Sequence, residues 1–372
     1  MRRASALIVG GGPAGSAAAI MLARAGIGPE LLERTIGPRD VVCGGFLGWD
    51  ALTQLEKLGI DPWMLGARPI ALLRLVSRDR IVEVRLPRCA AGISRRTLDE
   101  ALMEAAADAG AIVRRGIAVR AVESSHRIRF DTGEEVESAA LFLATGKHDL
   151  RGVARELPIA TADAAVGFRV SLIPSPESRE ALSGVVELHL FQGGYAGLLM
   201  QDDGTANLCL SVSQVRLKQA GGIDGLAAEL LAQLPYLARR IDGPMQSRWN
   251  SIAGVRYGWS ARHTEAGLFR LGDQAAVIAS LASDGIAMAL TSGVEAAAWF
   301  LRKGPAGAHK FQSSFARRVQ WPLNIASTIR RGVESTTAGG RIMRLLTVAP
   351  ALASVTARLT RISVRSSLWN RP

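Results

Sequence analysis

The residues that could do chemistry begin near the N-terminus, where regularly spaced glycines follow an apolar run. Gly10, Gly12 and Gly15 come directly after Ala6–Val9 and open an alanine-rich stretch. This pattern predicts a buried strand, a tight turn and a helix whose free N–H groups can bind the pyrophosphate of a dinucleotide. Glu33 stands about 20 residues further on, where a carboxylate accepts a hydrogen bond from a ribose hydroxyl. An acid there favours a ribose without a phosphate.

Two later apolar runs end in turns of small or acidic residues. Residues 139–143 lead into Ala144-Thr145-Gly146, and residues 268–271 lead into Gly272-Asp273. Ligands of open α/β sheets bind outside the carboxyl ends of the strands, so we expect both turns near the glycine turn. A long helix is then predicted from Asp284-Gly285-Ile286 to about residue 301. Its N-terminus is a second candidate anion site, with Asp284 as a candidate cap.

Two strand patterns supply the elements that must position these turns. Short, wholly apolar runs near the N-terminus and near residue 270 are typical of buried parallel strands. Residues from about 160 to 260 form strand-like segments separated by Gly193-Gly194 and Asp203-Gly204, which predicts an antiparallel sheet. A predicted hairpin over 70–86 joins this second lobe.

The composition limits the class of protein. The 372 residues are 48% hydrophobic, which suffices for a large core and two lobes. The cysteines Cys43, Cys89 and Cys209 have no metal-ligand spacing, so we expect no metal site, no disulfide framework and a cytoplasmic location. The first strand begins too early for a signal peptide, and no run of about 20 apolar residues predicts a membrane span.

The net charge of +12 is concentrated towards the C-terminus, where residues 310–372 contain eleven lysines and arginines and one acid, Glu334. This basic region is open to three interpretations: a solvated helical face, a surface for nucleic acid, or a surface for anionic lipid. The sequence has no nucleic-acid recognition motif, so we expect no such partner. Peripheral contact with the inner face of the membrane would let a hydrophobic substrate enter the site directly.

Together the motifs resemble those of FAD-dependent oxidoreductases with the p-hydroxybenzoate hydroxylase fold, a family of aromatic hydroxylases, geranylgeranyl reductases and flavin halogenases. The resemblance covers roughly residues 1–310 and includes the Glu33-Arg34 pair and Arg95 ahead of Leu98-Asp99. It implies an α/β fold with a Rossmann-like FAD-binding domain, an inserted antiparallel β-sheet substrate domain and a C-terminal helical tail. The FAD-binding domain would comprise 1–70, 90–160 and 265–310, the substrate domain 71–89 and 161–264, and the basic helical region 311–372.

The resemblance also implies roles in binding FAD. Glu33 would hold the adenosine ribose, Arg95 the phosphate or ribityl region, and Asp273 the ribityl chain. The N–H groups of Gly285 and Ile286 would face the flavin pyrimidine edge, where reduced FAD carries negative charge. The residues expected to contact FAD are Gly10, Gly12, Pro13, Ala14, Gly15, Glu33, Arg34, Cys43, Gly44, Gly45, Arg95, Val119, Thr145, Gly146, Gly272, Asp273, Asp284, Gly285 and Ile286.

Several stretches bear on the branch of the family. Ser280 and Ser283 stand where the family usually has a proline and a glycine, and the Trp-x-Trp-x-Ile-Pro motif of halogenases is absent. Cys43-Gly44-Gly45 is similar to a segment of prenyl reductases. Residues 144–152 and 187–191 are similar to flavoproteins encoded beside type III polyketide synthases, which are thought to hydroxylate phenolic lipids.

We therefore expect an FAD-dependent monooxygenase that hydroxylates a hydrophobic phenolic or polyketide-type substrate through a flavin hydroperoxide formed with dioxygen. The chain has no second dinucleotide fingerprint, so NAD(P)H would visit only transiently as the reductant. One alternative is a flavin-dependent reductase of prenyl double bonds of the geranylgeranyl type. Another is a flavin-binding membrane-surface protein without catalysis.

The candidate catalytic residues lie on the antiparallel strands expected to cover the flavin. They are Arg169, Glu187, His189 and Tyr195, of which Glu187 and His189 share a face because they are two residues apart. Their alternative placement is the solvent side of a half-buried sheet. Lys147 could contact the cofactor or belong to a solvated loop.

Overall fold

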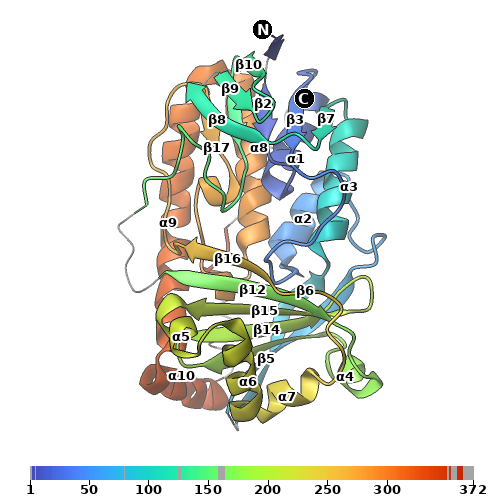
Figure 1. Cartoon of the computed structure of the whole chain (residues 1–372), viewed down its shortest axis with the longest axis vertical. Helices are drawn as coiled ribbons and strands as arrows, with labels where there is room; N and C mark the ends of the chain where they lie inside the picture. The colour runs from blue at the N-terminus through green and yellow to red at the C-terminus, as the bar shows by residue number, and fades with distance from the viewer. Residues whose placement is uncertain are drawn as a thin grey trace.

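The computed structural model describes residues 2–4, 6–78, 80–124, 127–157, 164–349, 352 and 358–362. Figure 1 shows an elongated molecule with a parallel sheet and its helices in the upper half and a large sheet across the lower half. The helix α9 (Gly307–Glu334) runs along one side of both halves. This architecture is the α/β fold with a helical C-terminal region that the resemblance implies.

A five-stranded sheet forms the centre of the upper half, and all its neighbouring strands are parallel. Helices cover one face of this sheet, and a four-stranded sheet covers the other. The central strands are therefore buried on both sides. The five strands are β2 (Leu7–Val9), β3 (Glu30–Glu33), β7 (Ile112–Arg115), β11 (Leu141–Leu143) and β17 (Leu268–Arg270), in the order β17-β11-β2-β3-β7. The covering sheet contains β1 (Arg2–Ala4), β8 (Val119–Ser124), β9 (Arg127–Phe130) and β10 (Glu135–Ser138).

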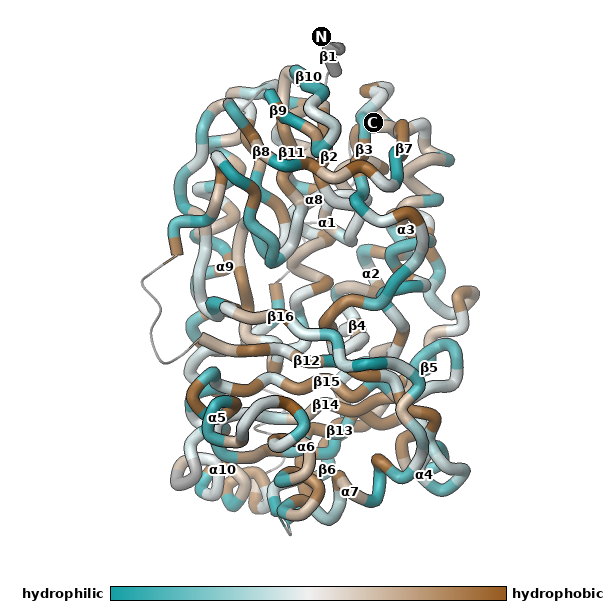
Figure 2. The backbone as a smooth tube through the Cα atoms, in the orientation of Figure 1, coloured by the Kyte–Doolittle hydropathy of each residue, from teal (hydrophilic) through white to brown (hydrophobic). Residues whose placement is uncertain are grey.

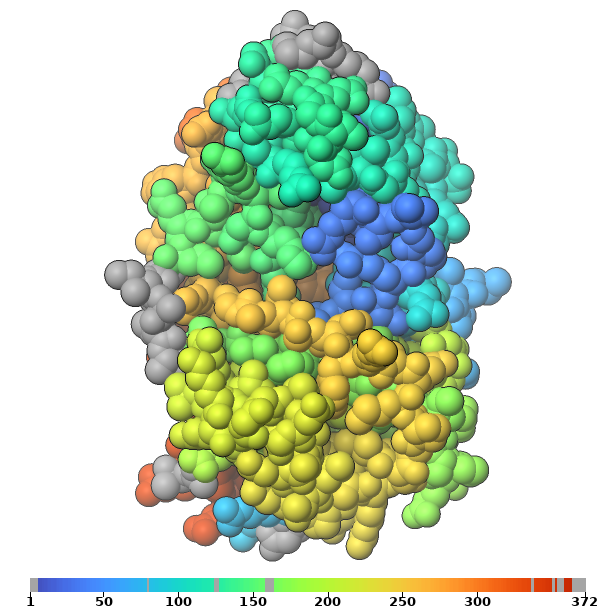
Figure 3. Space-filling view, viewed as in Figure 1, coloured from blue at the N-terminus to red at the C-terminus, as the bar shows by residue number. Residues whose placement is uncertain are grey.

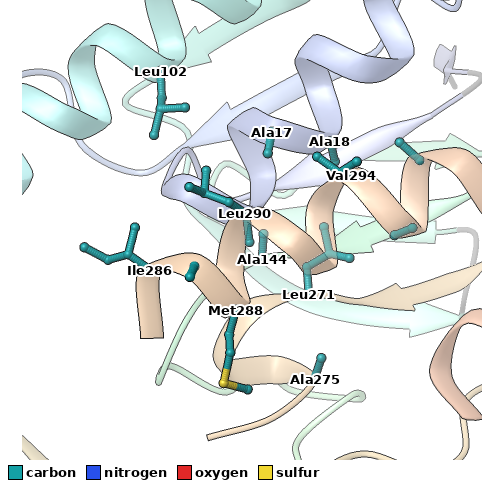
Figure 4. Packing of buried hydrophobic residues seen from close by; sticks show 14 of the residues in the cluster. Ala17, Ala18, Leu102, Ala144, Leu271, Ala275, Ile286, Met288, Leu290 and Val294 are labelled. Atoms are coloured by element: carbon teal, nitrogen blue, oxygen red, sulfur yellow. The ribbon is translucent and has the colours of Figure 1, made fainter. Parts of the chain in front are cut away.

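Three helices cover the first face of the parallel sheet: α1 (Pro13–Arg24), α3 (Arg95–Asp108) and α8 (Gly285–Lys303). Small residues let α1 and α8 approach closely, since a Cβ at Gly293 would lie 2.2 Å from the carbonyl oxygen of Ala14. Figure 4 shows the two alanines Ala17 and Ala18 against Val294 in this contact. The close contact fixes α8, and hence its N-terminus, relative to the glycine turn that precedes α1.

The lower half is a single eight-stranded sheet. All its neighbouring strands are antiparallel except β13 and β5, which are parallel. The hairpin predicted over 70–86 is present, although Asp79 of its turn lies outside the described residues. The strands are β4 (Phe46–Leu47), β5 (Arg68–Ser77), β6 (Arg80–Gly92), β12 (Ala165–Leu172), β13 (Val185–Phe191), β14 (Gly194–Met200), β15 (Ala206–Ser213) and β16 (Asn250–Val255), in the order β16-β12-β15-β14-β13-β5-β6-β4.

The two faces of this sheet have different neighbours. We call one of them the outer face. Its side chains, including Leu198 and Leu208, pack against α6 (Ile223–Gln233) and α7 (Pro235–Arg240). The opposite, inner face carries Leu188, Leu190 and Tyr195 and packs on α9 and on α10 (Thr336–Val348). Side chains alternate between faces along each strand, and both faces are covered. Accordingly, Figure 2 shows much of the strands of the lower sheet as hydrophobic. The remaining helices are α2 (Trp49–Lys57), α4 (Pro176–Ala181) and α5 (Gln214–Gln219).

The C-terminal region connects the two halves. Phe311 and Phe315 at the start of α9 pack with Phe269 of β17, and Val333 near its end reaches the inner face. Residues 358–362 then return to the start of α8 and to α2. Within the described part of the chain, no helix is long and apolar enough to cross a membrane.

Candidate active site

A cavity of about 560 Å³ lies at the carboxyl edge of the parallel sheet. Figure 3 shows the hollow between the N-terminal segment in blue and the green segment near residue 150. Its wall includes Asn250 and Ile252 of β16, so both halves of the molecule contribute to it. The residues expected to contact FAD that line it are Gly10, Gly12, Glu33, Arg34, Arg95, Val119, Thr145, Gly146 and Asp273.

The glycine turn is shaped by contacts that exclude side chains. Gly10 has a φ of +109°, and a Cβ there would lie 2.4 Å from the carbonyl oxygen of Ala144. A Cβ at Gly15 would lie 2.0 Å from the carbonyl oxygen of Gly10. The N-cap of α1 is Gly12, which has no side chain to accept from the first-turn N–H groups. These groups therefore face the cavity as donors for an anion.

Glu33 is held as a carboxylate at the end of β3. It accepts hydrogen bonds from the N–H of Gly11 at 2.9 Å and from the N–H and hydroxyl of Thr35 at 3.0 and 2.8 Å. Burial raises the pKa of Glu33, but these hydrogen bonds outweigh burial and lower it. A fixed carboxylate at this edge has the geometry to accept from a ribose hydroxyl.

Arg95 begins α3, and Asp99 orients its guanidinium. Nε and Nη2 of Arg95 each lie 2.7 Å from a carboxylate oxygen of Asp99. A Cβ added at Gly12 would come within 3.3 Å of Arg95 Nη2, so the cation lies over the glycine turn. Burial lowers the pKa of Arg95, but the Asp99 carboxylate outweighs burial and raises it. Ser94 caps this helix by accepting from the N–H of Thr97.

The turns after β11 and β17 meet at the carboxyl edge of the parallel sheet. Lys147 Nζ lies 2.8 Å from Asp273 Oδ2, and both residues line the cavity. The side chain of Gln274 donates to the carbonyl oxygens of Gly146 and His148. Lys147 is thus a cavity residue and not a solvated loop residue.

Arg169 is buried behind the cavity lining, where it holds the segment 40–45. Its guanidinium lies 3.1 Å from Asp40 Oδ2 and donates to Asn207 Oδ1 at 2.7 Å. The amide of Asn207 in turn donates to the carbonyl oxygens of Cys43 and Gly44 at 3.1 and 2.8 Å. Arg169 is 3% exposed, so this placement favours positioning the Cys43-Gly44-Gly45 segment over contact with substrate.

Glu187 and His189 share a face, as predicted, but that face is the outer one. Glu187 Oε2 lies 3.0 Å from His189 Nε2, and Glu187 Oε1 pairs with Arg240 of α7 at 3.1 Å and with Arg74 of β5 at 2.5 Å. The sheet separates both residues from the inner face. This placement argues against the catalytic role expected from their strand positions.

Tyr195 lies on the inner face in a chain of hydroxyls. It donates to Ser280 Oγ at 2.5 Å, and Ser280 lies 2.7 Å from the hydroxyl of Tyr257, which lies 3.2 Å from Ser211 Oγ. Burial raises the pKa of Tyr195 well above its ordinary value, so the phenol stays protonated. Ser280 is exposed, so the chain links a buried phenol to solvent.

The remaining expected residues lie at the ends of two helices. Pro13, Ala14 and Gly15 form the first turn of α1, and a Cβ at Gly272 would touch Ala14. Gly285 and Ile286 begin α8. The prediction that Asp284 caps α8 is wrong, because its carboxylate binds Arg361 and the N–H of Ile362 instead.

The comparison with known families agrees with this site. Residues 3–148 match the FAD binding domain family. The chain is an FAD-dependent oxidoreductase. The geometry of the cavity suits FAD independently of this match. An uncapped helix N-terminus, a turn without room for side chains and a fixed carboxylate all line it. Among the described residues, no cluster of side chains could hold a metal ion.

Relatives of this oxidoreductase include proteins of several named activities. A menaquinone reductase of Mycolicibacterium smegmatis is 28% identical over 396 residues, which cover 98% of this chain and 91% of that protein. The flavin-dependent brominase Bmp2 has a TM-score of 0.80 at 17% identity, with 96% of this chain and 93% of that chain covered. PqsL of Pseudomonas aeruginosa, described as a probable FAD-dependent monooxygenase, has a TM-score of 0.71 at 15% identity, with 92% and 100% covered. These structural similarities show a shared fold.

Sequence motifs identified the glycine turns and Glu33 but missed the residues that organise the rest of the site. Asp40, Gln201 and Asn207 bind Arg169, and Tyr257 completes the hydroxyl chain. No local pattern marks these residues, because each partner comes from a distant strand or loop.

Proposed function

We propose that this oxidoreductase binds FAD along the cavity, with the adenosine end at Glu33 and the flavin towards the inner face. The N-terminus of α1 and Arg95 would bind the pyrophosphate, and Asp273 the ribityl chain. Gly285 and Ile286 would donate to the pyrimidine edge of the flavin. The hydrogen bonds of Glu33 and the Arg95–Asp99 pair support this assignment, because they fix both groups before any ligand arrives.

We propose that the substrate is a hydrophobic small molecule bound at the inner face. The side chains there, which include Leu75, Val84, Leu188 and Leu190, form an apolar layer against α9 and α10. Tyr195 is the polar group at the edge of this layer, and its hydroxyl chain leads to the loop before α8. The chain thus places an apolar layer beside a route for one proton.

The reaction favoured by this arrangement is reduction of a quinone-like or prenyl-type lipid. FAD, once reduced by NAD(P)H, would supply a hydride, and Tyr195 would supply the proton, which Ser280 and Tyr257 replace from solvent. The observation that supports reduction most directly is the similarity to a menaquinone reductase over 98% of the chain. For this reason we rank reduction ahead of the hydroxylation that the sequence motifs favoured.

Hydroxylation of a phenolic or polyketide-type substrate with dioxygen is the second candidate. It is supported by the resemblance of residues 144–152 and 187–191 to flavoproteins encoded beside type III polyketide synthases. In this case Tyr195 would hydrogen-bond to the phenol oxygen and orient its ring.

Product mass and oxygen uptake separate the two reactions. The purified protein with FAD is incubated with NADH or NADPH and with menaquinone or an alkylphenol, in air and without oxygen. Reduction gives a product about 2 mass units heavier in both atmospheres, whereas hydroxylation gives one about 16 units heavier and only in air. Tyr195→Phe should lower kcat of either reaction, whereas Tyr236→Phe, on the outer-face helix α7, should not. If the protein binds FAD but no donor reduces it, both reactions are excluded.

We further propose that α10 contacts an anionic membrane surface from which the substrate enters. Its inward residues, including Met343, pack on the inner face. Its outward side exposes Arg341 and Arg344 together with Leu345 and Val348, which are 56% and 86% exposed. Exposed apolar residues beside arginines are typical of helices that lie in the interface of an anionic bilayer.

A further inference from the structure

The start of α8 contains a buried carboxylate that does not cap its own helix. Asp284 is the residue before Gly285, the first residue of α8, and it makes no side-chain hydrogen bond to the helix. Aspartate is among the strongest N-cap residues, because its carboxylate accepts from first-turn N–H groups and favours the positive end of the dipole. Asp284 is 1% exposed, so its charge needs other partners.

The partners come from the C-terminal segment. Nη1 of Arg361 lies 2.9 Å from Asp284 Oδ1, and the N–H of Ile362 donates to Asp284 Oδ2 at 3.2 Å. The guanidinium of Arg361 is itself held over the ring of Trp49 in α2, 4.2 Å from the ring centroid. Both carboxylate oxygens are therefore bound by residues more than 70 positions further along the chain.

This arrangement leaves the N-terminus of α8 open. A Cβ added at Gly285 would meet no atom within 4 Å, so space is free beside the first turn. The first intrahelical hydrogen bond runs from the N–H of Met288 to the carbonyl oxygen of Asp284, so the earlier N–H groups point out of the helix. Under the proposed function, these groups meet the pyrimidine edge of FAD, which carries negative charge when reduced.

We propose that Arg361 is a positioning residue that holds the Asp284 carboxylate away from α8 and so keeps the helix N-terminus available to the flavin. This inference rests on the proposed placement of FAD. Without Arg361, the Asp284 carboxylate turns to cap its own helix, where it occupies the N–H groups and cancels part of the positive dipole. Reduced FAD then loses more stabilisation than oxidised FAD, because it carries the extra charge.

The test compares the midpoint potential of bound FAD, and the dissociation constants of oxidised and reduced FAD, in four full-length proteins. They are the wild type, Arg361→Met, Arg361→Met/Asp284→Ala and Arg358→Met, which removes an exposed arginine from the same segment. Measurement at about pH 8.5 keeps Asp284 ionised in the wild type, where burial raises its pKa to about 7 against the opposing effect of Arg361. Loss of Arg361 raises this pKa further, so the potential of the Arg361 variants is also followed to higher pH. Circular dichroism checks that each variant is folded.

Arg361→Met should weaken the preference for reduced over oxidised FAD about tenfold, the scale of a charge at a helix terminus, and lower the midpoint potential accordingly. The double variant should recover the wild-type potential, because no carboxylate remains to cap the helix, and Arg358→Met should match the wild type. If Arg361→Met does not fold, Arg361→Gln replaces it, with the same expected shift and the same rescue by Asp284→Ala.

Three outcomes overturn the inference. The first is a wild-type potential in Arg361→Met with FAD bound, and the second is a lowered potential that the removal of Asp284 does not restore, which would indicate a merely structural role. The third is an equal effect of Arg358→Met. A wild-type protein that binds no FAD would instead contradict the proposed function, so the two failures are distinguishable.

Discussion

Gly15 shows how strictly one position can be determined at the residue scale. The glycine lets the first turn of α1 approach the backbone of Gly10, and the contact leaves no room for a methyl group. The same contact presents the α1 N–H groups to the cavity, so we expect stability and FAD binding to depend on this one residue.

Gly15→Ala should therefore destabilise the fold and weaken FAD binding together. Overpacking of this kind costs about 1–3 kcal/mol of unfolding free energy, and the displaced turn should raise the FAD dissociation constant at least about tenfold. Urea unfolding and FAD titration measure the two effects. Gly28→Ala is the control, since a Cβ there meets nothing within 4 Å; similar behaviour of the two variants would contradict the argument.

Glu187 belongs to a buried charge cluster, and its titration should appear in the stability of the protein. Burial raises the pKa of Glu187, but His189, Arg74 and Arg240 outweigh burial and lower it to about 2. The folded carboxyl thus binds a proton more weakly than the unfolded one. Its stabilisation is present above the ordinary carboxyl pKa and is lost as the pH falls from about 4.5 towards 2.

Glu187→Gln should cost about 2–4 kcal/mol at neutral pH, because it removes the carboxylate that pairs with the half-buried Arg74 and Arg240. It should also flatten the acid limb of the stability curve. Urea midpoints measured from about pH 7 to pH 2.5 test both effects. The exposed Glu180→Gln variant of α4 should behave as the wild type. If the urea midpoint of Glu187→Gln falls with decreasing pH as steeply as that of the wild type, other carboxyl groups are responsible for the acid sensitivity.

At the element scale, α10 is the clearest case of a helix with two roles. Its inward residues pack against the apolar layer of the inner face, whereas its outward arginines and apolar residues are exposed to solvent. The sequence indicated a basic helical region, but the division of its faces depends on the strands against which it packs.

Flotation on vesicles tests the membrane role of α10. The wild type should float with vesicles rich in anionic lipid, and Arg341→Ser/Arg344→Ser should lose most of this binding, since each basic residue near the surface contributes about 1 kcal/mol. The matched control is Arg248→Ser/Arg262→Ser, which removes two exposed arginines outside α10. Equal flotation of both variants, or no flotation of the wild type, would contradict the proposal.

At the scale of the whole molecule, the cavity wall joins the two halves, because the glycine turn and β16 both line it. A ligand bound there should stabilise both halves at once. FAD at about one hundred times its dissociation constant should add about 2.7 kcal/mol to the free energy of unfolding.

Scanning calorimetry with and without FAD tests this coupling. The expected result is a single unfolding transition that moves to higher temperature as FAD is added. Hydrogen exchange should slow in β16 as well as in β2. Protection confined to β2 would show that the lower sheet does not take part in binding.

The sequence by itself determined the parallel half and the glycine turn at its carboxyl edge. Buried parallel strands read as short apolar runs, and a turn that admits no Cβ leaves glycine as its signature, so Gly10, Gly15 and Glu33 could be assigned from local spacing. These features depend on neighbours in the chain and on the geometry of one βαβ unit.

Only the tertiary structure decided which residues of the antiparallel half face the site. Alternation showed that Glu187 and His189 share a face, but it could not show which face packs on α7, because that depends on helices distant in sequence. The same holds for Arg361, whose charge is part of a basic tail in the sequence and a partner of Asp284 in the fold. Long-range pairing of charges follows from packing, which local patterns do not encode.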